Sequence, residues 1–188
     1  QAWASTLELD WFFRSASCNG STLDPVAQRQ RGGAVLLYSN DADRDDVAFL
    51  RLNTQPPAGV VYAGSWFGEP AKPGEVLTDV HHGSRDVQSF SEAQLLSYCW
   101  RNGEEYADCE ARPEEDATYW RVLSVQGFLP NGASGSGLFR SVGGKRYLIG
   151  ALSGSPNPYL ACDGSGGFNG VPLPPGDRID FFSRFDKS

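Results

Sequence analysis

The sequence lacks residues on which several classes of protein depend. Its 188 residues contain no methionine, only two histidines and four cysteines, and no two cysteines form a CxxC pair. Because zinc ribbons are built from such pairs, a structural zinc site of that kind is not expected. Basic residues are also scarce, with 16 Lys and Arg against 23 Asp and Glu. The resulting net charge of −7 argues against a nucleic-acid partner, whose phosphates require a basic surface.

Long apolar runs and cofactor motifs are missing too. No apolar run approaches the roughly 20 residues that a membrane-spanning helix requires, so we expect no membrane insertion. The glycines between residues 164 and 170 do not form a GxGxxG motif, and the acidic loop 104–116 lacks the spacing of an EF-hand. We therefore expect neither a cofactor nor a metal ion.

The missing methionine and the cysteines bear on where the protein works. A chain without methionine does not begin where translation begins, so we expect Gln1 to be a processed or cut end, before which a secretion signal would not be visible. Four cysteines indicate an exported protein with disulfide bonds. Cys99 and Cys109, ten positions apart across the acidic loop, could form one. Cys18 and Cys162 could pair with each other or with cysteines outside this sequence.

Short runs rich in Val, Tyr, Phe and Trp alternate with turns rich in Gly and Pro. This pattern is typical of an all-β fold. We expect residues 33–38 to form a buried strand, whereas the segment 90–100 fits either a strand or a capped helix. The predicted strands cover residues 5–13, 33–38, 47–52, 75–80, 118–125, 137–139, 147–152 and 178–182.

One stretch, residues 131–139, places Ser134 in a tight glycine turn that leads into a predicted β-hairpin. Glycines on both sides of a serine let the backbone turn sharply and aim N–H groups at one point, as attack on a carbonyl requires. A Gly/Ser surface turn is the alternative. An α/β-hydrolase elbow does not fit, because it needs glycine two residues after the serine and this chain has Ser136 there.

Two further features bear on catalysis. His81 and His82, the only imidazoles, end a predicted strand; neighbours on a strand point to opposite faces, which disfavours a shared metal ion. Either histidine could serve as a catalytic base, or both could be structural. Asp46 stands directly before an apolar strand, where hydrogen bonds can fix a carboxylate so that it orients a histidine. An ordinary turn aspartate is the alternative.

Taken in order, these segments resemble a chymotrypsin-fold (trypsin-like) serine endopeptidase, most closely the secreted bacterial lysyl endopeptidase branch. Residues 46–52 resemble the strand that opens with the catalytic aspartate. Residues 62–66 and 80–83 resemble the Trp-Ala-Gly-Trp and Ile-His-His-Pro segments of that branch. Residues 132–139 resemble its nucleophile loop, and residues 148–154 resemble the strand that walls the substrate pocket.

The resemblance implies an antiparallel double β-barrel that hydrolyses peptide bonds through an acyl-serine intermediate. Ser134 would be the nucleophile, and the backbone N–H groups of Gly132 and Ser134 would form the oxyanion hole. Asp46 would orient the catalytic histidine. The resemblance also implies a secreted monomer that acts on polypeptide substrates.

The same resemblance implies a specificity pocket walled by Ser153, Gly154 and Ser155, which would also pair with the substrate backbone. Phe128, six residues before the serine, is not the acid that trypsin uses to select basic side chains, and the sequence does not identify the acid that lysyl endopeptidases use. Ala133 replaces the aspartate that clamps the new N-terminus of chymotrypsin-like zymogens. That activation switch is therefore not expected.

The chain departs from the family in one respect. The family's catalytic histidine precedes the aspartate, whereas this sequence has no histidine before His81, and the family's His-His pair lies away from the triad. We therefore expect an N-terminally incomplete chain. Residues 1–56 would be the remainder of the first barrel, residues 57–69 a linker, and residues 70–188 the second barrel with the nucleophile loop.

This departure leaves three hypotheses. The first is a serine endopeptidase whose histidine lies outside this sequence, so that the chain alone is inactive. The second is a catalytically inactive protease-like module that binds peptides or partners. The third gives His81 or His82 the role of base. Cys18 and Cys162 match positions that in the family bond to cysteines near the N-terminus, which favours the first hypothesis.

Overall fold

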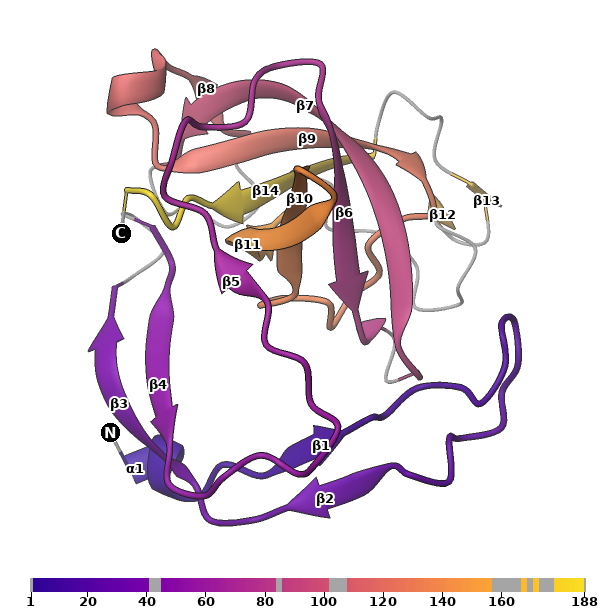
Figure 1. Cartoon of the computed structure of the whole chain (residues 1–188). Helices are drawn as coiled ribbons and strands as arrows, with labels where there is room; N and C mark the ends of the chain where they lie inside the picture. Colours follow the sequence, from indigo (N-terminus) through magenta and orange to yellow (C-terminus); the bar gives the residue numbers. More distant parts are fainter. Residues whose placement is uncertain are drawn as a thin grey trace.

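A computed structural model of the chain describes residues 2–40, 45–83, 86–101, 108–156, 167–168, 171–172 and 178–187. Almost all regular structure in these ranges is β (Figure 1). The helical segments are one turn of α-helix, α1 (Ala2–Ser5), and the 3-10 turn η2 (Glu114–Asp116). Among the described residues, neither is long and apolar enough to cross a membrane.

Six strands close into an antiparallel barrel (Figure 1). They are β6 (Val76–His81), β7 (Ser89–Trp100), β9 (Tyr119–Gln126), β10 (Gly137–Val142), β11 (Lys145–Gly154) and β14 (Ile179–Ser183). Their order is β10–β6–β7–β9–β14–β11, and β11 pairs back with β10 to complete the ring. A closed ring removes free sheet edges. The all-β, chymotrypsin-type barrel predicted from the sequence is confirmed.

Further short strands lie at the margins of the barrel. One runs parallel to β11, one pairs with β7, and two pair only with each other. In that order they are β5 (Gly64–Ser65), β8 (Glu110–Ala111), and β12 (Gly167–Phe168) with β13 (Val171–Pro172).

The alternation of side chains explains why these segments are strands. In β6, Leu77, Asp79 and His81 are buried, while the residues between them are not. Strand β7 shows the same period of two over its first half. The segment 90–100, which fitted either a strand or a helix, is therefore a strand, because its inward positions recur every second residue rather than every 3.6 residues.

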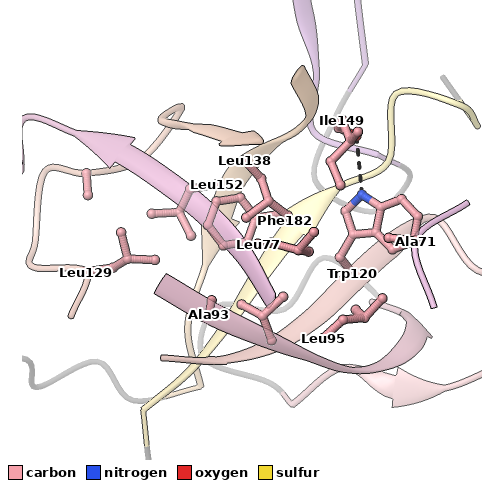
Figure 2. Packing of buried hydrophobic residues seen from close by; sticks show 12 residues of the cluster. Ala71, Leu77, Ala93, Leu95, Trp120, Leu129, Leu138, Ile149, Leu152 and Phe182 are labelled. Carbon is pink, nitrogen blue, oxygen red and sulfur yellow. Dashed lines mark hydrogen bonds between the residues drawn. The ribbon is translucent and has the colours of Figure 1, made fainter. Parts of the chain in front are cut away.

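One apolar cluster fills the barrel interior (Figure 2). Trp120 is only 1% exposed, and its indole N–H donates to the backbone carbonyl of Ile149 at 3.2 Å. The ring is therefore buried without leaving its polar atom unsatisfied. The members are Ala71, Leu77, Ala93, Leu95, Trp120, Val122, Leu129, Ala133, Leu138, Ile149, Leu152 and Phe182.

A disulfide bond joins Cys99 at the end of β7 to Cys109, with the Cα atoms 5.5 Å apart. This confirms the pairing that the ten-residue spacing suggested. Both cysteines are buried and pack with Tyr119 and Phe181 in a second apolar cluster. Cys18 is a free, exposed thiol, and Cys162 lies outside the described residues.

The first four strands form two separate antiparallel ladders, β1 with β2 and β3 with β4, at the side of the barrel (Figure 1). Their bounds are β1 (Leu9–Trp11), β2 (Gln28–Gln30), β3 (Ala34–Ser39) and β4 (Ala48–Leu52). The strand expected over residues 5–13 is thus shorter than predicted. It ends before Phe12, whose φ of +55° lies in the left-handed region that no strand continues through.

The β3–β4 ladder is also more exposed than the sequence suggested. The segment 33–38 was expected to be buried, yet Val35, Leu37 and Tyr38 are each more than 40% exposed, and Phe49 on β4 is 62% exposed. Two strands alone cannot cover both of their faces, and no further strand joins this ladder among the described residues. The expectation of burial was wrong for this reason.

Two sets of contacts join the ladders to the barrel. Near the end of β6, the Gln88 N–H donates to the Phe13 carbonyl at 3.0 Å, and the Phe13 ring lies 6.0 Å from that of His82. The second set surrounds Asp46, whose carbonyl accepts a hydrogen bond from the Ser183 hydroxyl of β14 at 3.3 Å. Asp46 is therefore fixed against the barrel by its own backbone.

Candidate active site

The serine turn, residues 131–136, contains a residue buried in the barrel core directly followed by a serine with an exposed hydroxyl. Ala133 is buried in the apolar cluster, whereas the next residue, Ser134, is exposed. Gly132 and Gly135 have φ angles of +86° and +82°, a region open to glycine but strained for other residues. Ser134 consequently stands at the tip of a tight turn, and its hydroxyl has no hydrogen-bond partner among the described residues.

Some backbone N–H groups of the serine turn donate hydrogen bonds, and others are left open. Those of Ala133 and Gly135 donate to backbone carbonyls at 3.1 and 2.8 Å. Those of Gly132 and Ser134 have no acceptor within the part of the chain that the structure describes. Two N–H groups left open on one turn could receive the negative charge that develops on a carbonyl oxygen under attack.

Asp46 lies two residues before β4 and is linked to β11, the strand that also contacts the serine turn. Its Oδ2 accepts a hydrogen bond of 2.7 Å from the hydroxyl of Ser153, a residue 107 positions away. Its φ of +48° is a backbone conformation that aspartate tolerates better than most residues. The carboxylate is thus held at the entry of β4 and directed towards β11.

Leu152 and Ser153 connect the serine turn with Asp46. The carbonyl of Leu152 accepts from Gly135 N–H at 2.8 Å, and its N–H donates to the carbonyl of Ser136 at 2.9 Å. The next residue, Ser153, holds Asp46. Two consecutive residues of β11 therefore fix the separation between the exposed serine and the carboxylate.

Ser153 is itself held by residues that the sequence did not single out. Arg101, at the end of β7, is buried, and its Nη1 donates to the Ser153 Oγ at 3.0 Å. The guanidinium lies over the rings of Tyr119 and Phe181, 5.8 and 5.1 Å from their centroids. Burial raises the pKa of Tyr119 to about 12, so this hydroxyl remains protonated.

The other predicted wall residues have more limited roles in the structure. The Ser155 hydroxyl donates to the carbonyl of Ile179 at 2.7 Å, and Ser153 donates to Asp46, so both side chains are engaged within the protein. A Cβ added at Gly154 would lie 3.4 Å from Arg101 Nη1, which is an ordinary van der Waals contact.

The two histidines lie apart from this arrangement. His81 is buried, and its Nδ1 accepts from the Gly83 N–H at 3.3 Å. Burial lowers the pKa of His81, with a further contribution from His82, so the imidazole is neutral near pH 7. Within the described residues neither imidazole hydrogen-bonds to Asp46 or Ser134.

His81 instead lines a separate cleft of about 320 Å³. Phe90, Phe128 and Asp86 also line this cleft. Phe128, the residue that occupies the position of the selecting acid of trypsin, lies on this cleft and supplies no charge.

Two buried carboxyl groups face the barrel interior. Asp79 of β6 is 0% exposed and its pKa is raised to about 7 by burial, although its Oδ1 accepts from the Ser136 hydroxyl at 2.8 Å. Asp180 of β14 is 2% exposed, and burial raises its pKa well above the usual range; the Ser124 hydroxyl lies 3.3 Å from it. The alternation of β6 could have revealed Asp79, because it lies between Leu77 and His81 on the inward face.

No group of three or more His, Cys, Asp or Glu side chains is placed to hold a metal ion in the described ranges. Residues 102–107, which include part of the acidic loop, lie outside those ranges. The chemistry that the site offers consists of an exposed hydroxyl, two open N–H groups and an anchored carboxylate.

The closed six-stranded barrel fits the chymotrypsin-type fold of serine proteases. Residues 1–163 match the family model described as "Lysyl endopeptidase, C-terminal domain", and the chain belongs to that family. The chain is 34% identical over 188 residues to a protein of Pseudomonas aeruginosa named lysyl endopeptidase. The match covers 98% of this chain and 35% of that relative, so the chain spans about a third of its length.

Proposed function

We propose that this chain carries the nucleophile and the orienting aspartate of a secreted serine endopeptidase. The observation that carries the proposal is the pair Leu152–Ser153. Leu152 exchanges two backbone hydrogen bonds with the serine turn, and Ser153 donates to Asp46 at 2.7 Å. A triad needs its serine and its aspartate at a fixed separation, with space for one imidazole between them.

In this mechanism the Ser134 hydroxyl attacks the carbonyl carbon of the scissile peptide bond and gives its proton to an imidazole. The electron pair of the carbonyl double bond moves to oxygen, where the Gly132 and Ser134 N–H groups stabilise it. Collapse of this intermediate expels the amine, which takes the proton, and leaves an acyl-serine. Water then repeats the sequence and releases the acid. Asp46 orients the imidazole throughout.

The imidazole comes from outside these 188 residues in this proposal. His81 is buried with its Nδ1 occupied by Gly83, and the His82 ring faces Phe13. Neither contacts Asp46 among the described residues, and an aspartate can only orient an imidazole that it hydrogen-bonds. The disulfide between Cys99 and Cys109 supports an oxidising, extracytoplasmic environment.

The name of the Pseudomonas aeruginosa relative makes peptides containing lysine the first substrates to test.

The test is hydrolysis of a lysine-containing peptide by the product of the whole gene and by the 188-residue chain alone. We expect turnover in the former and none in the latter, because the chain alone has no imidazole at Asp46. In the whole product, Ser134→Ala is expected to lower kcat by at least about 10⁴-fold. Turnover by the isolated chain that requires Ser134 would contradict the proposal.

A catalytically inactive module that binds peptides is the second candidate, and it is favoured by the separation of both histidines from Asp46. It predicts that the whole gene product binds peptides with no Ser134-dependent turnover. A histidine encoded upstream of Gln1 together with turnover would exclude it. The two candidates therefore give opposite results in the same assay.

A further inference from the structure

Three of the hydrogen bonds among the described residues tie the serine turn to the strands β6 and β11. Two are backbone bonds to Leu152 of β11. The third is the 2.8 Å bond from the Ser136 hydroxyl to Asp79 Oδ1 of β6. This third bond is made by two side chains, and its acceptor can gain or lose a proton. It also ties the turn to the strand on the opposite side of β10.

The position of Asp79 is costly for the fold and needs an explanation. The residue is 0% exposed, and its Oδ2 has no hydrogen-bond partner among the described residues. Ser91, directly opposite it on β7, is equally buried and its hydroxyl also has no partner there. Leu77, two residues before Asp79 on the same face, belongs to the apolar cluster. Burying a carboxyl group among such residues costs free energy of folding. Among the described residues, the hydrogen bond from Ser136 is the contact that offsets this cost.

We propose that Asp79 is a positioning residue for the nucleophile: its carboxyl group holds the Ser136 hydroxyl and thereby fixes the backbone of the serine turn. The inference rests on the proposed function, since it assigns a purpose to the geometry around Ser134. Ser136 follows the nucleophile by two residues, and its N–H closes the turn on Ala133 at 2.9 Å. A fixed Ser136 therefore keeps the Gly132 and Ser134 N–H groups in one orientation.

The surroundings of Asp79 determine how this contact responds to pH. Burial raises its pKa to about 7, and the hydrogen bond from Ser136 opposes that shift. The titratable groups that face the same interior are Asp180 on β14, which interacts electrostatically with Asp79, and His81 on β6 itself. A carboxylate accepts a stronger hydrogen bond than a carboxylic acid does, so the turn is held more firmly when Asp79 is ionised.

The first experiment follows the serine turn directly in the 188-residue chain, without any assay of catalysis. The Gly135 and Ser136 amide resonances are titrated by NMR between pH 5 and 9, and their hydrogen exchange is measured. We expect a transition with a midpoint near 7 that is lost in Asp79→Asn, and amide exchange at least about 10-fold faster in Ser136→Ala. Titration of His81 would persist in Asp79→Asn, so loss of the transition isolates Asp79.

Ser91→Ala is the matched control. It removes a buried hydroxyl that also neighbours Asp79 but is not connected to the serine turn, so we expect the exchange and the transition to be unchanged. Equal exchange in Ser136→Ala and Ser91→Ala would overturn the proposal. So would a transition that survives Asp79→Asn.

The second experiment uses the whole gene product and measures kinetics. Asp79→Asn and Ser136→Ala are each expected to lower kcat by about 10-fold with KM within about twofold, and the double variant is expected to be no worse than either single one. Additive losses would overturn the proposal. If no form of the protein hydrolyses peptides, the proposed function fails, whereas the NMR result still decides whether Asp79 fixes the turn.

Discussion

The β1–β4 ladders and the six-stranded barrel contain the same kinds of strand-forming residues, but the two regions bury them differently. In the barrel, Trp120 and Phe182 are at most 1% exposed. In the β3–β4 ladder, Phe49 is 62% exposed and Tyr38 is 44% exposed. Every barrel strand has a neighbour on each side and an interior to point into, whereas each ladder strand has one neighbour. Burial is thus decided by ring closure rather than by residue type.

The candidate active site uses both regions. The serine turn belongs to the barrel, where Ala133 anchors it in the core, and Asp46 belongs to the loosely covered ladder. The hydrogen bond from Ser153 to Asp46 is where the two regions meet. The following predictions test whether most of the free energy of unfolding comes from the barrel, and whether contacts with the barrel hold Asp46 in position.

The largest expected effect comes from the barrel core. Trp120→Ala removes a ring that is 1% exposed and is expected to lower the free energy of unfolding by about 3–5 kcal/mol. Phe49→Ala in the ladder is the matched aromatic control and is expected to change it by less than about 1 kcal/mol. Urea denaturation measures both values. Equal losses would show that the ladder is as tightly packed as the barrel.

Removal of the disulfide bond is expected to have the next largest effect. Replacing Cys99 and Cys109 by serine opens a loop of ten residues and is expected to cost about 2–3 kcal/mol, measured by the same denaturation experiment. The free, exposed Cys18 provides the control, since Cys18→Ser is expected to change stability by less than about 0.5 kcal/mol. A loss of the same size in Cys18→Ser would contradict this assignment.

Ionisation of Asp79 is expected to make the barrel less stable at higher pH. Its pKa in the folded chain, about 7, lies above the ordinary value of 3.8, so between these values the folded chain keeps a proton that the unfolded chain has lost. The stability present below pH 4 is therefore lost as the pH rises towards 7, by at most about 1.4 kcal/mol per pH unit. We expect the free energy of unfolding to fall by about 2 kcal/mol between pH 5 and pH 8, and by less in Asp79→Asn. An unchanged pH dependence in this variant would show that another group is responsible.

The smallest expected effect concerns the link between the regions. Ser153→Ala removes the hydrogen bond to Asp46 and is expected to cost about 1 kcal/mol. Amide hydrogen exchange in β4 should become faster while exchange in the barrel core stays the same, because only the ladder loses an anchor. Ser141→Ala, at an exposed position of β10, is the control and is expected to change neither quantity. Unchanged exchange in β4 would mean that other contacts hold the ladder.

Local sequence patterns predicted much of the barrel. The hairpin of β10 and β11 followed from two apolar runs around a Gly-Gly turn, and the Cys99–Cys109 bond from a short spacing across one loop. These features depend on residues close together in the sequence. The closure of six strands into a ring was expected only through resemblance to a family, since no local pattern specifies which strands meet.

The contacts of the candidate site could not be read from local patterns. Asp46 and Ser153 are 107 positions apart, and Asp79 and Ser136 are 57 apart. Ser153 was expected to line a substrate pocket, and its bond to Asp46 was not foreseen. Arg101, which no sequence pattern singled out, is buried against two aromatic rings. Each case depends on which strands become neighbours, and that is decided by the packing of the whole barrel.

The separation of Asp46 from its two anchors also has a consequence during protein synthesis. Ser153 and Ser183 follow Asp46 by 107 and 137 residues. At ribosomal rates of about 5–20 residues per second, roughly 5–30 s pass before either hydroxyl exists. During that interval neither of these hydrogen bonds can form, so the position of Asp46 is fixed only after most of the chain has been synthesised.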